Sequence, residues 1–364
     1  MKKIIIKKPS FIKLLNIILI VITLCLILNA LFNKDRDIFL LKTKNMINTK
    51  LETILNTYHY NNSLKGKLKP YLEYLEYSKN DVNLNGNLFI NSLTPKISVV
   101  ISLYNRQQYI KSTIKSIQNQ NLIDIEIVII DDCSKDNSTK YIKTMQKRDQ
   151  RIILLQNKEN MGTLYSKSIG VLYSKGQFIQ SLDSDDMLCN QNYLSIMYDI
   201  AIKNNYDYLT SKSLYISDLF KFVSIYQPFP TVIWSKLIKR ELYIDSIFKI
   251  GINLLKMKVV TLDDDIIALY MFRKQKGVKI NIIGIAHYTH GTHQVFVNAF
   301  KSEKTAYIFC KNIITTIRSF YMLNDSIGFI EGKWLLDKRI IKGPCSPFIN
   351  KDEIKDLIRN NTFK

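Results

Sequence analysis

The sequence predicts an α/β fold in which a mostly parallel central sheet is covered by helices, with a transmembrane helix near the N-terminus. Two observations carry this prediction. After residue 95, four apolar, β-branched segments begin 26 to 29 residues apart, which leaves room for one crossover helix between successive buried strands. Residues 14–32 form a stretch of 19 residues without a charge. A helix of that length crosses the roughly 30 Å hydrocarbon core of a bilayer.

Composition excludes several classes of protein. The chain has 364 residues, 46% of them hydrophobic, with only 12 Gly and 7 Pro. A disordered or collagen-like chain has a different composition. The 52 Lys+Arg against 31 Asp+Glu give a net charge of +21, which fits nucleic acid, a membrane surface or an anionic substrate. Charge is the sole argument for nucleic acid, and we expect no nucleic-acid partner.

The N-terminal lysines orient the apolar stretch. Five of them precede residue 14, whereas the positive charges just after residue 32 are offset by aspartates. The positive-inside rule predicts a cytosolic tail (1–13), a signal-anchor (14–32) and a single-pass type II membrane protein, which we expect in the Golgi or endoplasmic reticulum with the rest of the chain in the lumen. A cleaved signal peptide is the alternative, but its apolar region is usually about 7–15 residues long and ends in small residues.

The five cysteines are too few for a disulfide scaffold. In an oxidising lumen one or two bridges are compatible with their number, but the sequence does not pair them.

Residues 33–95 are predicted to form a stem. Leu40, Ile47, Leu51 and Ile54 recur at helical spacing among polar residues, so this segment is a candidate contact for homo-oligomers. Thr94-Pro95 marks its end.

The four predicted strands are residues 96–103, 125–130, 151–155 and 177–182. In the first crossover, Ile110, Ile114 and Ile117 share one face of a helix. Parallel sheets of this kind bind ligands beyond the carboxyl ends of their strands.

Polar residues gather at those ends. They occupy 104–106 after the first strand, 131–134 after the second and 183–186 after the fourth. Asp131, Ser134 and Asp136 are also candidates for helix caps. Carboxylates brought together without a cation repel each other, so their convergence favours a bound metal or a hydrogen-bonded ligand. No Gly-rich phosphate loop follows any of these strands.

Taken together, these segments resemble the family-two glycosyltransferases with the GT-A fold. The resemblance covers about residues 97 to 293, so we place a glycosyltransferase domain at 96–300 and a C-terminal helical extension at 301–364. That extension carries an apolar helical stripe: Ala306, Phe309, Ile313, Ile317 and Phe320. The segments that match in order and spacing are VVISLYN (99–105), EIVIIDDCSKDNS (126–138), NKENMGT (157–163), FIQSLDSDDML (178–188), VIWSKLIKRELY (232–243) and TLDDDIIALYMF (261–272).

The resemblance implies a UDP-sugar donor and a divalent metal, Mn²⁺ or Mg²⁺, that neutralises its diphosphate. Asp183 and Asp185 match the family's Asp-x-Asp motif, with Asp183 at the ribose or metal and Asp185 at the metal. Asp132 takes the position that accepts a hydrogen bond from uracil, with Asp131 beside it. The same nucleotide pocket is implied to be lined by Ser102, Tyr104 and Asn105.

The resemblance also implies the catalytic residues. Asp264 and Asp265 match the family's acidic pair at the start of a helix, with Asp265 as the base. Among residues 263–265, the alignment with that pair can also shift by one residue. Trp234 and Lys236 match the acceptor side, although core packing explains Trp234 about as well. His290 or His293 is a candidate metal or diphosphate ligand.

The predicted function is therefore inverting transfer of a sugar from a UDP-sugar to a glycan, glycoprotein or glycolipid acceptor. A second hypothesis is a catalytically silent, membrane-tethered module with the same fold that binds a glycan or a partner. It is motivated by Ser168, which stands where the family usually has Asn, and by the open acidic register.

Overall fold

The computed structural model describes residues 75–76, 95–217, 222–228, 232–257, 259, 263–271, 275–289 and 302–322, with single residues between 337 and 355. All of them belong to a unit spanning residues 70–364. The predicted tail, signal-anchor and most of the stem lie outside the described residues. Within the described ranges, the structure contains no helix long and apolar enough to cross a membrane.

The four predicted strands are confirmed. They are β2 (Ile97–Leu103), β3 (Ile125–Asp131), β4 (Ile152–Asn157) and β5 (Phe178–Asp183). They pair in parallel in the order β4-β3-β2-β5. All seven residues of β3 are buried, which is why its sequence is a continuous apolar run rather than an alternating one.

The rest of the sheet differs from the prediction of a mostly parallel arrangement. Strand β9 lies antiparallel between β5 and β7, and β10 runs parallel to β7, so the sheet is mixed. Between β7 and β9 the chain forms the antiparallel strand β8, and no described helix makes the crossover that a parallel return requires. The remaining strands are β1 (Leu75–Glu76), β6 (Met187–Leu188), β7 (Tyr208–Ser217), β8 (Phe222–Tyr226), β9 (Lys236–Lys239) and β10 (Gly277–Thr289).

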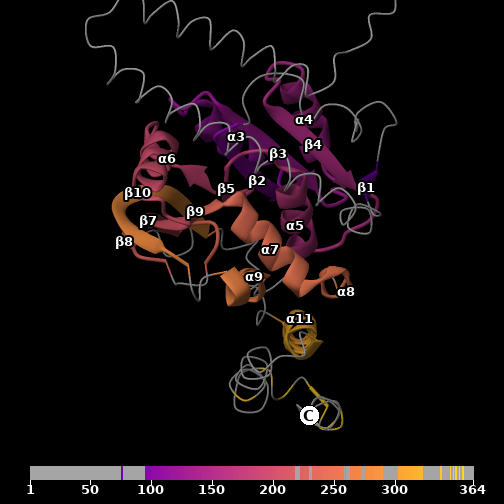
Figure 1. The fold of residues 1–364 in the computed structure, drawn as a ribbon. Coiled ribbons are helices and arrows are strands. Elements are labelled where there is room, and N and C mark those ends of the chain that lie inside the picture. Colours follow the sequence, from indigo (N-terminus) through magenta and orange to yellow (C-terminus); the bar gives the residue numbers. More distant parts are fainter. Residues whose placement is uncertain are drawn as a thin grey trace, which may run out of the picture. The chain divides into compact units, whose positions relative to one another are not determined.

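Helices cover both faces of the sheet (Figure 1). The helices α3 (Ile110–Gln118), α4 (Ser138–Gln146) and α6 (Tyr193–Asn204) share one apolar core with the sheet. The predicted helical face of Ile110, Ile114 and Ile117 is fully buried in that core, as expected.

The opposite face carries α5 (Thr163–Tyr173) and α7 (Arg240–Ile250), which Figure 1 shows in front of the sheet. Helix α5 approaches the strands closely at Gly170, where an added Cβ would lie 2.3 Å from Cδ1 of Ile130. Beyond α7 follow α8 (Ile252–Leu255) and α9 (Asp263–Met271). The close approach of α5 to the strands at Gly170 holds this helix, which carries Lys167, against the sheet.

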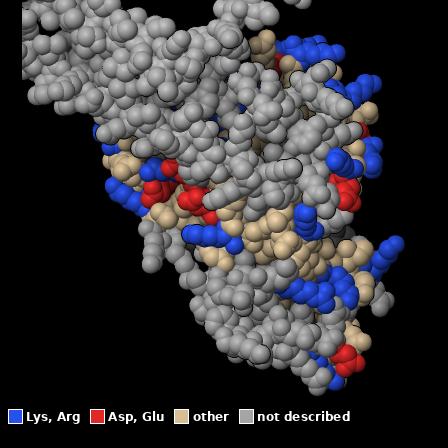
Figure 2. Space-filling model, turned by 45° about the vertical axis from the view of Figure 1, so that its right-hand side comes forward, with Lys and Arg blue, Asp and Glu red and all other residues tan. Residues whose placement is uncertain are grey.

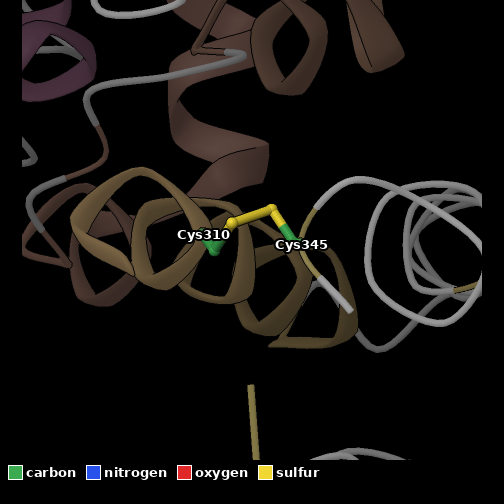
Figure 3. Close-up of a disulfide and its surroundings, with 2 residues drawn as sticks. All are labelled: Cys310 and Cys345. Atoms are coloured by element: carbon green, nitrogen blue, oxygen red, sulfur yellow. A yellow bond between two sulfur atoms is a disulfide. The ribbon is translucent and has the colours of Figure 1, made fainter. Parts of the chain in front are cut away.

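The C-terminal extension begins with α11 (Glu303–Met322). The predicted apolar stripe is buried at Ala306, Phe309, Ile313 and Ile317, which confirms a packing role; the side chain of Phe320 is outside the described part. A disulfide joins Cys310 of α11 to Cys345, 35 residues away (Figure 3). Of the other described cysteines, Cys133 and Cys189 are free thiols.

Candidate active site

The sheet brings the predicted polar clusters to one edge, as the sequence indicated. Ser102 of β2 is in register with Asp183 of β5, and Leu103 is in register with Asp131 of β3. The loops after these three strands therefore start side by side. Their polar side chains, however, are engaged mostly with one another.

Asn105 joins the loop after β2 to the loop after β3. Its backbone N–H donates to Oγ of Ser134 at 3.0 Å, and its Oδ1 accepts from the N–H of Lys135 at 2.7 Å. Asn105 has a left-handed backbone (φ 52°), a conformation that Asn tolerates better than most residues. The neighbouring Tyr104 is 43% exposed, so its ring is available to a ligand.

Asp131 is buried, and its carboxylate accepts hydrogen bonds from residues shortly after it in the chain. Its Oδ1 accepts from the N–H of Ser134 at 3.0 Å and its Oδ2 from the hydroxyl of Thr139 at 2.5 Å. Neither contact caps the following helix: α4 begins at Ser138, and its N-cap residue Asn137 makes no side-chain capping hydrogen bond, so the expected cap at Asp131 is not formed.

Asp132 is also buried, at 4% exposure. Its Oδ1 accepts from the N–H of Met161 and from Nδ2 of Asn157, both at 2.7 Å, and its Oδ2 accepts from the N–H of Gly162 at 2.9 Å. Burial raises the pKa of Asp132, and these hydrogen bonds oppose the increase. Instead of pointing to an open pocket, the carboxylate organises the loop that leads into α5.

The Asp-x-Asp motif at the end of β5 is partly exposed. The carboxylate of Asp185 lies 3.4 Å from Nε of Arg106, and that of Asp183 lies 3.3 Å from Nζ of Lys167. The side chains of Asp183 and Asp185 are 31% and 21% exposed. Both carboxylates therefore remain accessible to solvent.

Asp186 has a role that the sequence did not indicate. Its buried carboxylate lies 3.1 Å from Nδ1 of His287 and accepts from the N–H of Tyr288. Burial raises the pKa of Asp186 to about 6. Burial opposes protonation of His287, but Asp186 outweighs it and raises the pKa of the imidazole to about 9. The pair thus ties β10 to the loop after β5.

Lys167 is the functional residue that the sequence analysis missed. This buried ammonium on α5 contacts Asp183, Asp263 at 3.1 Å and Asp264 at 3.2 Å. Burial opposes its charge, but the three carboxylates outweigh it and hold the pKa of Lys167 well above its ordinary value. Among these three carboxylates the compensating positive charge is therefore that of a lysine, where we expected a bound metal or a ligand. The sequence feature that could have identified Lys167 is that it is the single charged residue in the largely apolar segment 163–173.

The aspartates at the start of α9 differ in their contacts. Both oxygens of Asp264 are engaged, Oδ1 with Lys167 and Oδ2 with the N–H of Ile233 at 2.9 Å. Burial raises the pKa of Asp264 to about 6. Asp265 belongs to the same helix, but its side chain lies outside the described part.

Trp234 and Lys236 do not offer an acceptor surface. Trp234 is 7% exposed, and its ring is stacked on His287 with centroids 4.7 Å apart. Lys236 is buried, its ammonium donates to the carbonyl of Val232, and burial lowers its pKa to about 8. Both side chains belong to the interior. His290 and His293 lie outside the described residues.

A divalent metal has two suitable oxygen ligands here. Among the residues that the structure describes, no three His, Cys, Asp or Glu side chains form a metal site. Mg²⁺, however, commonly takes only one or two protein carboxylates and completes its shell with substrate phosphates and water. The partly exposed Asp183 and Asp185 fit that pattern.

In α/β sheets, ligands bind beyond the carboxyl ends of the parallel strands, and the acidic cluster of this domain lies at that edge. Comparison with known proteins identifies the class more closely. Residues 98–262 match the family model of glycosyl transferase family 2. This segment is similar to the glycosyltransferase domains of that family, and the protein is a glycosyltransferase.

Individual relatives agree with this. Glycosyltransferase GlyG of Streptococcus pneumoniae serotype 4 is 29% identical over 222 residues, 50% of this chain and 71% of GlyG. A Campylobacter jejuni enzyme, GalNAc(5)-diNAcBac-PP-undecaprenol beta-1,3-glucosyltransferase, is 36% identical over 104 residues, 28% of this chain and 34% of that enzyme. The matched region thus spans most of GlyG but only about a third of the Campylobacter enzyme.

Among solved structures, Staphylococcus aureus TarS residues 1–349 in complex with UDP-GlcNAc superimposes with a TM-score of 0.51. The match covers 73% of this chain and 82% of TarS at 14% identity, so it supports the fold alone. The relatives named here are bacterial, and they give no support to a Golgi or endoplasmic reticulum location.

Proposed function

We propose that this glycosyltransferase moves a sugar from a UDP-linked donor to a glycan, protein or lipid acceptor with inversion at the anomeric carbon. The observation that carries the proposal is the meeting of two acidic elements, the Asp183–Asp185 motif and the start of α9, through Lys167. One element suits the donor diphosphate and the other suits the acceptor hydroxyl. We take uridine as the nucleotide by analogy with TarS, a protein of the same fold whose structure was solved in complex with UDP-GlcNAc.

The donor would occupy the edge formed by the loops after β2, β3 and β5. Tyr104 is exposed there, Asn105 joins the loops after β2 and β3, and Asp132 holds the loop after β4 against the loop after β3. Mn²⁺ or Mg²⁺ held by Asp183 and Asp185 would neutralise the charge that develops on the leaving diphosphate. Arg106, beside Asp185, adds a positive charge to the same end of the sheet.

Asp265 is the proposed base. In an inverting transfer the acceptor oxygen bonds to the anomeric carbon, the bond from that carbon to the diphosphate oxygen breaks, and the acceptor proton passes to a carboxylate. Asp264 is a poor candidate because both of its oxygens already have protein partners. Asp265 follows it in the first turn of α9, where the helix N-terminus favours the ionised carboxylate.

The test is turnover of nucleotide sugars by the purified protein. We expect release of UDP from at least one UDP-sugar in the presence of Mn²⁺ or Mg²⁺, with acceptors that include lipid-linked glycans, the acceptor class named for the Campylobacter relative. Asp265→Asn should lower kcat by about 100-fold or more, because a general base contributes about 10² to 10⁴. Asp245→Asn, on α7, is the matched control and should keep the activity.

Two results would contradict this function. If UDP and its sugars bind under no divalent metal, the donor is wrong. If binding occurs but neither Asp265→Asn nor Asp183→Ala alters the cellular effect of the protein, the chain acts as a binding module instead.

We also propose that residues 14–32 anchor the enzyme in a membrane, with residues 1–13 on the cytosolic side. The uncharged stretch and the five lysines before it support this proposal.

A further inference from the structure

The ammonium group of Lys167 connects two distant parts of the chain. It lies 3.3 Å from Asp183 at the end of β5, and 3.1 and 3.2 Å from Asp263 and Asp264 at the start of α9. The Lys167 side chain is 4% exposed. Because solvent screens buried charges far less than exposed ones, these contacts hold the two elements firmly together.

On the side of α7, the cluster of Lys167 and its three carboxylates lies next to the buried side chain of Tyr243. The hydroxyl of Tyr243 is buried and has no hydrogen-bond partner in the described part of the chain. Burial raises the pKa of Tyr243, and the charges that act on it are those of Lys167 and the same three carboxylates. The ammonium of Lys167 is therefore interior while Asp183 remains partly exposed, and removal of the cation leaves the negative charges around it uncompensated.

The start of helix α9 makes a second polar contact, with the backbone before β9. Oδ2 of Asp264 accepts from the N–H of Ile233, just before the segment that leads into β9. Asp264 thus has one oxygen on Lys167 and one on the backbone of the 232–235 segment. The start of α9 is held by these two polar contacts, and of the two only Lys167 reaches the donor side.

We propose that Lys167 is a positioning residue that fixes α9 relative to the end of β5. This inference rests on the proposed function, in which Asp183 belongs to the donor side and Asp265 on α9 is the base. A bridge between them keeps the base at a constant distance from the anomeric carbon. Displacement of a reacting group by about 1 Å can cost about 100-fold in rate.

Lys167→Met tests the bridge, because Met has nearly the same length and no charge. We expect kcat to fall by about 100-fold while the dissociation constant for UDP stays within about fivefold of the wild-type value. Lys167→Arg keeps the charge and should retain at least about tenfold more kcat than Lys167→Met. Lys203→Met makes the same chemical change on the exposed side of α6 and should match the wild type.

Three results would overturn the proposal: a folded Lys167→Met enzyme with kcat reduced less than about tenfold, a loss confined to UDP binding, or equal kcat in the Met and Arg variants. If Lys167→Met does not fold, Asp263→Asn replaces it, since this change removes one arm of the bridge and leaves Asp183 and Asp264 paired. It should lower kcat by about tenfold with UDP binding unchanged; an unchanged kcat would contradict the bridge.

Failure of the proposed function is separable from failure of the bridge. If the wild-type protein turns over no nucleotide sugar, hydrogen exchange still measures the link. Lys167→Met should then increase exchange at the amides of α9 but not at those of β2 and β3, whereas Lys203→Met should leave α9 unchanged. Unaltered protection of α9 in Lys167→Met would exclude the bridge.

Discussion

At the scale of single residues, Asp186 and His287 form an interior ion pair next to the Asp183–Asp185 motif. Asp186 is fully buried, and the His287 ring is also covered on one face by Trp234. A pair of this kind depends on both groups being charged. Its contribution to stability should therefore change with pH in a direction that the pKa of His287 determines.

We expect the stabilising effect of His287 to decline as pH rises from about 6.5 to about 9. The pKa of His287 is about 9 in the folded protein and about 6.5 in the unfolded chain, so the folded state binds the proton more tightly. A raised pKa gives stability that is complete below the unfolded value and lost as pH passes the folded value. The whole effect is at most about 3 kcal/mol.

The measurement is the difference in unfolding free energy between the wild type and His287→Gln, followed against pH without divalent metal. Groups that do not interact with His287 cancel in this difference, whereas Asp186 does not, because its pKa depends on His287. The same comparison in an Asp186→Asn background is the control and should be nearly independent of pH. A flat difference with Asp186 present would show that His287 is not protonated in the folded protein.

Lys167 and Trp234 show which single residues the sequence could not assign. Two of the three carboxylates that contact Lys167, those of Asp263 and Asp264, lie about a hundred residues further along the chain, and the ring stacked on Trp234 is that of His287. No local pattern encodes such pairs. The lone lysine in a helix with nine buried residues was nevertheless a usable signal, because a buried charge requires a partner.

At the scale of elements, the predictable parts were those with a strong period. The buried parallel strands are continuous β-branched runs, and α3 has three isoleucines on one face, so both could be located from the sequence. The four-residue strand β9 has no such period, and its antiparallel direction depends on the chain path through β8. The sequence therefore predicted the first half of the sheet and not the second.

The loop before α5 is bonded at three points to the side chain of Asp132. The oxygens of Asp132 accept hydrogen bonds from three buried donors: the N–H groups of Met161 and Gly162 and the side chain of Asn157. We expect Asp132→Ala to lower the unfolding free energy by about 2–3 kcal/mol. Each buried donor left without an acceptor costs free energy, while loss of the buried carboxylate offsets part of that cost.

Urea unfolding and hydrogen exchange together check this prediction. The loss should be accompanied by faster exchange in residues 157–166, because the released donors lie there. Asp199→Ala, on the exposed side of α6, is the matched control and should change stability by less than about 0.5 kcal/mol. A loss equally small in Asp132→Ala would mean that other contacts hold the loop.

At the scale of the whole molecule, the charge of +21 has more than one origin. On the face in Figure 2, the described Lys and Arg side chains lie among Asp and Glu side chains and do not form one continuous patch. Residues 1–95 hold 14 Lys+Arg and 6 Asp+Glu, so 14 − 6 = 8 of the 21 charges precede the glycosyltransferase domain. A basic chain can adsorb to anionic lipid by charge alone, whereas residues 14–32 would insert by their apolar character.

Salt and charge substitutions separate these two modes of membrane attachment. If residues 14–32 are an anchor, the full chain should stay with sedimented membranes in about 1 M salt, where the Debye length is about 3 Å, and leave them only in detergent. Ile20→Lys with Leu24→Lys should release it, because each lysine near the centre of a membrane helix costs about 2.5–3.5 kcal/mol.

Ile123→Lys with Ile308→Lys adds the same charge at exposed apolar positions and should leave the protein attached. Release of the wild type by salt would assign attachment to surface charge, because only screened electrostatic contacts are lost under those conditions. Equal behaviour of the two double variants would exclude the anchor as well. In that case the apolar stretch would have to be explained by another role.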